Sequence, residues 1–538
     1  MKTKMKSRIQ RLSLTGLILG MGLTLSAGDL SGQTQEPALQ TVIDDDTKAA
    51  QDQKIQQLQD KLEEIQQQIL ELKRANSAQP ETHHFTTAKA SAPPPSISAT
   101  EPVITSGTEP VITDPSNPKS EPFAFADFTW LTGNARTKDT PYATKFFSPE
   151  IRTDTNYTYD FRHPQDNTIS GSSEIFRANE VQLTQLGVGG DFHYDNVRAR
   201  FMTQFGLYSQ TTPRNDASTA RGQWNLADAY RYISEAYGGY HFNVQHGVNV
   251  DAGIFMSYVG LFSYYQFDNW AYQPSYVSSN TPWFFNGVRV QWFPTAKLKI
   301  EPWFINGWQS YGRFNNRPGL GGQILWRPNG NWSIVGNQYG YGEDALGIPT
   351  RTRYHTDDSV QYKYYDRPTS FISKAAASLT GDAGCESGGG VSCFGNGKTG
   401  PKQSFLGFMA YNRVWFDRDR YALTVGGGKI NNPGRYLVLL PPINGATAAS
   451  GTPYFTENPG DPYKAWDTSV TVDYMPSQYF TYRLEYNHRA ANVPYFTGPG
   501  GVTPPGGNTG TPGSVVPGWT PDLRNSENRM TVAFLLKF

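Results

Sequence analysis

Residues 528–538 read NRMTVAFLLKF, and large apolar residues occupy alternate positions along them. Successive side chains of an extended strand point to opposite faces, so this stretch predicts a two-faced strand. The apolar face carries Met530, Val532, Phe534, Leu536 and Phe538. The other face carries Arg529, Thr531, Ala533 and Lys537, with Leu535 as its one large apolar residue. Such a strand fits either the edge of a soluble core or a wall between lipid and a wet lumen.

The composition favours the wall between lipid and lumen. Charged residues make up only 17% of the 538 residues, whereas aromatic residues make up 14%. Transmembrane barrels have this profile because every second strand residue faces the lumen and aromatic rings gather at the membrane interfaces. Beyond the N-terminus no apolar run of about eighteen residues occurs, which excludes a membrane protein built of helices. Lys and Arg together number 47, as do Asp and Glu, so the net charge gives no reason to expect a nucleic-acid partner.

Residues 1–28 have the three parts of a secretory signal peptide. Basic residues precede an apolar run from Leu12 to Leu25, and small residues follow at 26–28. An anchor helix is the alternative, but it would need a longer apolar run. Export favours a disulfide between Cys385 and Cys393, the only two cysteines, which lie in a Gly-rich segment.

After a polar segment at 29–50, residues 51–75 predict a coiled coil in the periplasm. Its apolar residues recur at spacings of three and four, which is a heptad pattern, and they are Ile55, Leu58, Leu62, Ile65, Ile69 and Leu72. We expect this helix to assist self-association, and the alternative is a single amphipathic helix lying on a partner. Residues 76–122 are rich in Pro, Ser and Thr and predict an extended linker.

From residue 123 to 538 one pattern recurs, in which two strand-like runs flank a short turn and a longer loop follows. The short turns fall at 195–196, 245–246, 294–296, 328–331, 366–368, 417–419 and 476–478. The long loops fall at 135–179, 210–229, 261–280, 341–353, 379–403, 431–465 and 491–527, with a shorter one at 311–318. This asymmetry is typical of outer-membrane barrels, whose short turns face the periplasm. With a first strand near 124–134 and the closing strand 528–538, the count is sixteen strands, and fourteen or eighteen are the alternatives.

Several stretches of this region resemble the OmpL-like beta-barrel porins of bacterial outer membranes. They are TWLTGN at 129–134, HPQDNTISG at 163–171, RGQWNL at 221–226, EAYGGY at 235–240, QPSY at 273–276, KIEPW at 299–303 and NGWQ at 306–309. The resemblance covers about residues 124–538 and implies a barrel and passive transport, without a substrate or functional residues. A closing strand that ends on Phe538 also resembles the signal read by the barrel insertion machinery. That machinery and outer-membrane lipid are therefore expected partners.

Charged strand residues must face the lumen, because a charge facing lipid costs about 2–4 kcal/mol at mid-membrane. By alternation, the basic pore-lining candidates are Arg198, Arg200, Arg231, Arg289, Lys299, Lys363, Arg413, Arg483, Arg489 and Arg529. The acidic ones are Glu235, Asp251, Glu301, Asp467, Asp473 and Glu485. The basic excess predicts a slight anion preference. The alternative is that these residues pair with one another and only keep the lumen hydrated.

The loop at 261–280 is rich in aromatic rings and is the candidate constriction loop, with Asp268, Trp270 and Tyr272 as its key residues. Rings that face a lumen can stack on sugars, which makes sugar selectivity a hypothesis. The favoured alternative is that these rings pack the loop against the barrel wall or a neighbouring subunit.

These observations predict a porin that passes small hydrophilic solutes by diffusion, as a homotrimer assisted by the coiled coil. A barrel that anchors an envelope tether or adhesin, with a plugged lumen, is the alternative. An outer-membrane enzyme comes third, because G-x-S-x-G, H-E-x-x-H, C-x-x-C and Walker-type sequences are absent. No metal site or cofactor is predicted.

Overall fold

The computed structural model describes residues 121–538 apart from 172–173, 217, 219–221, 314–315, 343–347, 349, 435, 437–442 and 446–460. Further upstream it describes only Gln56, Asp60, Lys61, Glu63 and Gln67, which are helical. The chain divides into two units, residues 1–97 and 98–538, and the fold below is that of the second unit. The predicted signal peptide, the heptad residues and the linker up to residue 120 lie outside the described residues.

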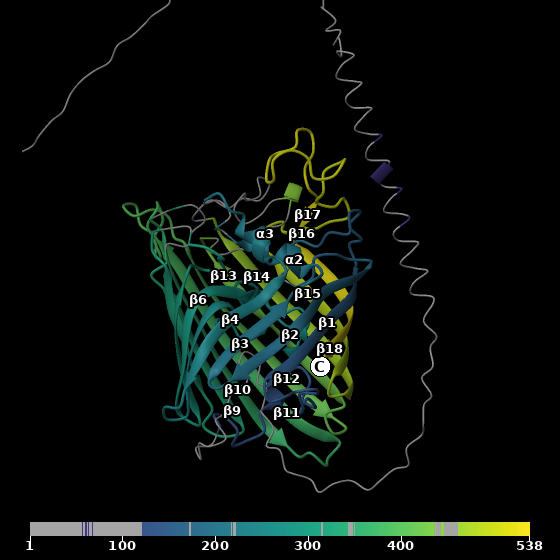
Figure 1. Ribbon diagram of the computed structural model, residues 1–538. Coiled ribbons are helices and arrows are strands. Elements are labelled where there is room, and N and C mark those ends of the chain that lie inside the picture. The colour runs from purple at the N-terminus through teal and green to yellow at the C-terminus, as the bar shows by residue number, and fades with distance from the viewer. Residues whose placement is uncertain are drawn as a thin grey trace, which may run out of the picture. The chain divides into compact units, whose positions relative to one another are not determined.

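Sixteen antiparallel strands form a closed barrel (Figure 1). The first eight are β1 (Phe147–Asp160), β2 (Val181–Tyr194), β3 (Val197–Thr203), β4 (Ile233–Phe242), β5 (Val248–Met256), β6 (Phe284–Thr295), β7 (Leu298–Ile305) and β8 (Gly319–Trp326). The others are β9 (Trp332–Gly340), β10 (Thr352–Asp366), β11 (Ile372–Ser387), β12 (Ser404–Phe416), β13 (Tyr421–Asn432), β14 (Tyr463–Ser477), β15 (Phe480–Ala491) and β18 (Ser526–Lys537). The barrel closes where β1 pairs with β18, so no strand edge is left open to lipid.

The remaining elements are short and lie in the connections. The helices are η1 (Thr129–Leu131), α2 (Tyr208–Thr211), η2 (Pro213–Asn215), α3 (Leu226–Tyr230), η4 (Gln266–Asp268), α4 (Tyr276–Ser279) and η5 (Ile443–Gly445). Strands β16 (Phe496–Thr497) and β17 (Leu523–Arg524) form a separate two-stranded sheet in the β15–β18 loop, above the barrel in Figure 1. Among the described residues no helix has the length and apolar character needed to span a membrane.

The closing strand has the two faces that its sequence predicts. Met530, Val532 and Phe534 are each about 40% exposed on the outer face. Between them, Thr531 and Ala533 are buried on the inner face. The other strands repeat this alternation, with large apolar and aromatic side chains outside and polar side chains inside. The predicted two-faced strand is thus confirmed, and its apolar face is the lipid face.

The seven predicted short turns are confirmed, and they join β2–β3, β4–β5, β6–β7, β8–β9, β10–β11, β12–β13 and β14–β15. The number of strands is also confirmed, but the position of the first strand is not. Residues 124–134 form no strand, and the first strand is β1, inside the segment 135–179 that the sequence predicts to be a loop.

Two physical reasons explain the misplaced first strand. Rings at Phe123, Phe125, Phe128 and Trp130 are separated by one or two small or polar residues and so imitate a strand, yet Phe128 and Trp130 are fully buried inside the barrel. The Asp127 carboxylate accepts hydrogen bonds from the backbone N–H and the hydroxyl of Thr129, which starts the 3₁₀ turn η1. In β1 the outer face carries mostly Thr and Tyr, so its alternation is weak in the sequence.

The lipid face gives a first test of strand orientation. Replacing Val532, at the middle of β18, with Arg places a charge in the hydrocarbon region and is expected to lower the free energy of unfolding by about 2–4 kcal/mol. Val197 also faces lipid, 55% exposed, but it begins β3 beside the Asp195–Asn196 turn. Val197→Arg is therefore the matched control, with an expected loss of about 0–1 kcal/mol. Urea unfolding in lipid vesicles, followed by tryptophan fluorescence, measures both, and equal losses would contradict this placement of the membrane.

Candidate functional site in the barrel lumen

The loop between β5 and β6, residues 257–283, folds into the barrel instead of out of it, and we call it loop L3. Every residue from Tyr264 to Trp283 is buried. Its two helical turns, η4 and α4, contact the inner wall at β18 and at β12–β14. The sequence favours packing of the rings of this loop against the barrel wall or a neighbouring subunit. Trp270 and Tyr272 are 3% and 0% exposed, so both rings are packed inside this barrel.

Arginines of the wall hold L3 by its backbone carbonyl groups. Arg483 on β15 donates to the backbone oxygens of Gln266 and Asn269, at 3.2 and 2.6 Å. Arg413 on β12 donates to the backbone oxygen of Trp270 at 3.2 Å. Both guanidinium groups are buried, and each can donate several hydrogen bonds in a fixed plane. They fix the path of the loop through bonds that do not depend on the identity of its side chains.

Carboxylates of the wall hold the following part of L3 by its backbone N–H groups. Glu485 accepts from the N–H groups of Tyr272 and Gln273, at 2.6 and 2.8 Å. Asp467 accepts from the backbone N–H of Tyr276 at 3.0 Å and from the hydroxyl of Ser275 at 2.8 Å, at the start of α4. Hydrogen bonds to a charged acceptor are the stronger kind, so this end of the loop is also fixed.

Ion pairs complete the attachment. Asp268 of L3 lies 2.7 Å from the guanidinium of Arg152 and 3.5 Å from the Lys537 amine. On the wall, Asp473 lies 2.7 Å from both Arg413 and Arg483. Asp473 therefore balances the two guanidinium groups that hold the loop. All three of these groups are fully buried, so the pairing is needed to offset their lost hydration.

A second segment, residues 121–137, lies at the turn end of the lumen, and we call it the inner segment. The backbone N–H of Phe123 donates to Ala296 in the β6–β7 turn, and the Trp130 indole donates to Gly330 in the β8–β9 turn. The Asn134 amide reaches the β14–β15 turn. The inner segment thus touches turns from widely separated parts of the barrel.

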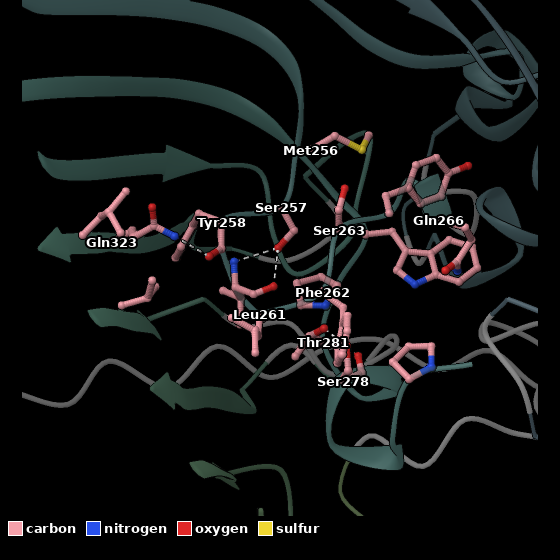
Figure 2. Close-up of a pocket in the computed structure, with 18 of the residues that line it drawn as sticks. Met256, Ser257, Tyr258, Leu261, Phe262, Ser263, Gln266, Ser278, Thr281 and Gln323 are labelled. Carbon is pink, nitrogen blue, oxygen red and sulfur yellow. Dashed lines mark hydrogen bonds between the residues drawn. The ribbon is translucent and has the colours of Figure 1, made fainter. Parts of the chain in front are cut away.

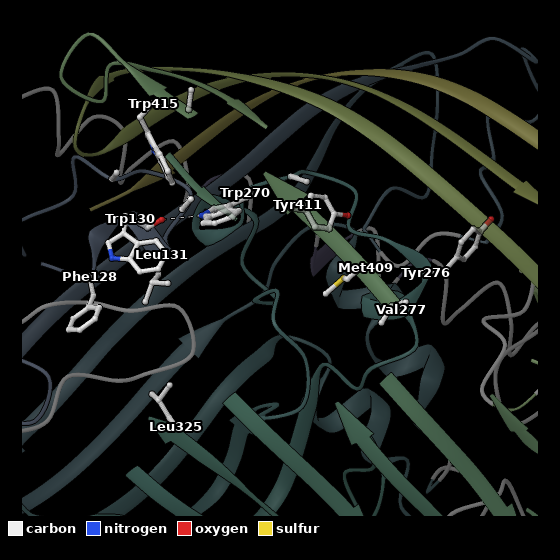
Figure 3. Close-up of a cluster of buried hydrophobic side chains, with 14 of the residues drawn as sticks. Phe128, Trp130, Leu131, Trp270, Tyr276, Val277, Leu325, Met409, Tyr411 and Trp415 are labelled. Atoms are coloured by element: carbon white, nitrogen blue, oxygen red, sulfur yellow. Dashed lines mark hydrogen bonds between the residues drawn. The ribbon is translucent and has the colours of Figure 1, made fainter. Parts of the chain in front are cut away.

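The inner segment and L3 share a hydrophobic core inside the barrel (Figure 3). The Trp270 indole donates to the backbone oxygen of Trp130 at 3.2 Å, and the Trp270 and Trp415 rings meet edge to face. The backbone N–H of Gly133 donates to the backbone oxygen of Asp268, and Arg413 donates to the backbone oxygen of Gly133. Together these residues fill the part of the lumen next to β11–β15.

A cavity of about 80 Å³ remains on the side of L3 that faces β8–β10 (Figure 2). It extends from Glu174, in the β1–β2 loop, to Arg327, beside the β8–β9 turn. Its wall residues are Gln323, Leu325, Arg327, Ser333, Val335 and Gln361. L3 supplies the opposite side, where Gln323 donates to the backbone oxygen of Tyr258 at 2.9 Å. The lining of the cavity therefore includes residues from both the loop end and the turn end of the barrel.

A larger cavity, of about 720 Å³, lies among the outer loops. It is lined by α2, η2 and α3 and by polar residues such as Arg177, Asn225 and Thr503. Asp216 lies on its border, and burial raises the pKa of this carboxyl group even though Ser218 and the backbone of Tyr311 donate hydrogen bonds to it. Trp224 is 81% exposed at this cavity.

Most of the predicted pore-lining charges do lie on the inner face, but they are paired. Arg198 and Arg289 share Asp251, and Lys299 pairs with Glu301. Arg200 pairs with Glu235 and also with Glu150 and Asp191. Arg489 lies 3.7 Å from Glu527 and stacks over the ring of Tyr276. Their role as pore-lining residues stays a prediction.

Arg231 is placed differently from its prediction. It precedes β4, at the C-terminal end of α3, where it pairs with Asp228 and borders the outer cavity. The alternation that gave it an inward position starts only at Ile233, because the chain is still helical before that point.

Sequence reasoning missed several inner charges. Glu150, Arg152 and Asp154 lie on β1, within the segment that the sequence predicts to be a loop, so alternation does not identify them. Arg327 directly follows β8. Leu325 is buried and Trp326 is exposed, so continued alternation places Arg327 on the inner face. Burial lowers the pKa of the Arg327 guanidinium, since no carboxylate in the described part of the chain offsets its lost hydration.

The two cysteines form a disulfide in the structure. Cys385 lies near the end of β11, and Cys393 lies in the loop that leads to β12. The bond links the end of β11 to the outer loop that leads to β12. Among the described residues no group of three or more His, Cys, Asp or Glu side chains is placed to hold a metal ion.

Solved structures with a similar architecture are outer-membrane proteins. They include OmpT of Vibrio cholerae, at 11% identity over 73% of this chain and 99% of that chain, with a TM-score of 0.40. The outer membrane channel DcaP of Acinetobacter baumannii matches at 13% identity over 73% and 96%, with a TM-score of 0.40. An anion-selective porin from Comamonas acidovorans matches at 9% identity over 73% and 99%, with a TM-score of 0.42. At TM-scores this low, these likenesses carry no argument about what this chain does.

No curated protein matches the sequence. A family model does match, over residues 153–538, which is most of the chain and includes nearly all of the barrel. Its description is putative beta-barrel porin-2, OmpL-like. The chain belongs to this family of OmpL-like outer-membrane porins.

Proposed function

We propose that this protein is a porin that lets small hydrophilic solutes diffuse across the outer membrane through a lumen narrowed by L3 and the inner segment. The observation that carries the proposal is the cavity between L3 and β8–β10, whose lining includes Glu174 from the loop end, Arg327 from the turn end and polar wall residues between them. A barrel that served only as an anchor would have no need of it.

The shape of the lumen supports a narrow and eccentric path. L3 and the inner segment fill the region beside β11–β15 with a hydrophobic core. On the opposite side, Gln323, Ser333 and Gln361 line the cavity together with Leu325 and Val335 at the border of that core. A path lined by amide and hydroxyl groups favours polar solutes over apolar ones. In this proposal Asp268, Trp270 and Tyr272 position the constriction loop and do not contact the solute themselves.

The selectivity that we propose is a slight preference for anions. Most inner charges are paired, so they add little to the field along the path. Arg327, which has no carboxylate partner among the described residues and lines the cavity, gives the path its net positive sign. A sugar-selective path is less well supported, because the rings of Trp270 and Tyr272 are packed into the core.

We propose further that the protein is a homotrimer in the outer membrane, assisted by a periplasmic coiled coil at 51–75. The heptad spacing of the apolar residues from Ile55 to Leu72 supports this, and so does the apolar outer surface of the barrel. The terminal strand offers Phe538, 39% exposed, to the insertion machinery.

Single-channel recording of the purified protein in a planar lipid bilayer tests the proposal. Stepwise openings are expected, in groups of three for a trimer, with a reversal potential under a salt gradient that indicates a slight anion preference. Heat-denatured protein at the same concentration is the control. Absence of openings from protein shown to be folded by its heat-modifiable mobility on a gel would reject the porin and favour an anchor or tether with a plugged lumen.

A further inference from the structure

Arg327 is unusual among the lumen arginines. Its side chain is 2% exposed and lies between two rings of the inner segment, with the guanidinium carbon 4.9 Å from the Phe123 centroid and 4.7 Å from the Phe128 centroid. Stacking on ring faces stabilises a cation and fixes the plane of the guanidinium group. The direction in which its N–H groups point is therefore set before any ligand arrives.

Two of the three guanidinium nitrogens of Arg327 have no acceptor among the described residues. Its Nε and Nη1 atoms are buried and make no hydrogen bond to any described residue. Arg413 and Arg483, by contrast, share the carboxylate of Asp473, and Arg289 has Asp251. A buried guanidinium without a carboxylate partner is unfavourable, so Arg327 is suited to accept an anion from the lumen as its partner.

Other polar side chains lie beside Arg327 in one row across the wall. Trp326 on β8 is opposite Ile334 on β9, so Arg327 and Ser333, the next residues on the two strands, are neighbours. Ser333 is opposite Gln361 on β10, and Gln361 is opposite Ser378 on β11. The Ser378 hydroxyl is also buried without a hydrogen-bond partner among the described residues.

The row faces the solute path. Arg327, Ser333 and Gln361 all line the cavity between L3 and β8–β10. A guanidinium group binds carboxylate or phosphate oxygens through parallel N–H donors, and neighbouring hydroxyl and amide groups can donate to the remaining oxygens. We propose that this row is a binding site for a small oxyanion, a phosphate or a carboxylate, within the lumen. The proposal rests on the porin function above, because the anion reaches the site through the same cavity.

Titration of the full-length protein in detergent with inorganic phosphate, followed by calorimetry at constant pH and ionic strength, tests the site. Saturable binding to the wild type is expected, and Arg327→Gln should weaken it by about tenfold or more, because a charge-assisted contact is lost. Arg418→Gln is the matched control, since Arg418 is an exposed cation in the β12–β13 turn at the same end of the barrel, and it should leave binding unchanged. Acetate in place of phosphate distinguishes a carboxylate from a phosphate preference.

Two further variants keep the test decisive if Arg327→Gln does not fold. Ser333→Ala keeps the charge and should weaken binding severalfold, and Arg327→Lys should bind more weakly than the wild type but better than Arg327→Gln. No saturable binding of phosphate or acetate to the wild type, or equal binding by wild type and Arg327→Gln, would overturn the proposal. Calorimetry is independent of conduction, so a protein that binds phosphate but forms no channels would reject the porin function and retain the site.

Discussion

Deletion of residues 123–137 is expected to raise the single-channel conductance severalfold. These residues fill the turn end of the lumen, where Phe128, Trp130 and Leu131 are at most 3% exposed. The barrel itself should remain closed, because β1 begins only at Phe147 and pairs with β18 through residues that the deletion leaves in place. Recording in a planar bilayer at fixed salt measures the change.

A deletion of equal length, residues 91–105 in the Pro-rich segment, is the matched control and should leave the conductance as it was. Trp130→Ala is a smaller version of the same change, since it removes the indole that donates to Gly330 and packs near Trp270. It should raise the conductance less than the deletion. If the deletion variant conducts like the wild type, the inner segment does not limit the path.

Asp473→Asn is expected to lower the free energy of unfolding by about 3–5 kcal/mol, because it leaves two buried guanidinium groups without their shared counter-charge. The Asp473 carboxylate is 2.7 Å from Arg413 and from Arg483, and all three side chains are fully buried. Asn keeps the size of the side chain, so the loss reports on charge. Urea unfolding in lipid vesicles, followed by tryptophan fluorescence, gives the value.

Asp417→Asn serves as the control for that measurement. Asp417 pairs with Arg420 in an exposed turn, 3.0 Å apart, and an exposed pair contributes only about 0–1 kcal/mol. Asn also tolerates the positive φ of 47° that Asp417 adopts. Similar losses in the two variants would show that Asp473 does not balance the charges that hold L3.

The barrel could be predicted because its strongest signals are local. Alternation along 528–538 and a short turn after every second strand both follow from the contact of one strand face with lipid, which each strand meets separately. The prediction of the first strand was wrong because rings within residues 123–130 pack inside the lumen and do not face lipid. The true first strand, β1, was not recognised because its outer face carries several polar residues and shows little apolar alternation.

The lumen was harder to predict because its contacts join distant residues. Parity along a strand shows that Arg413 faces inward, but not that it reaches Gly133, which is 280 residues away in the chain. It also cannot show that Asp473 lies between two arginines, since this depends on the register of the four strands β12–β15 and on the path of L3. The lack of a partner for Arg327 is a property of the whole surrounding wall, and no local pattern encodes it.

The hydrogen bonds between the barrel wall and L3 affect how the sequence of L3 can evolve. Arg413, Arg483, Glu485 and Asp467 bind mainly the peptide groups of the loop. Every amino acid offers the same carbonyl oxygen, and every one except Pro offers the same N–H. Side chains along L3 that face the cavity can therefore be exchanged by mutation without release of the loop. Descendants of one ancestor can acquire different permeability while they keep the same frame, and an engineer can use that frame in the same way.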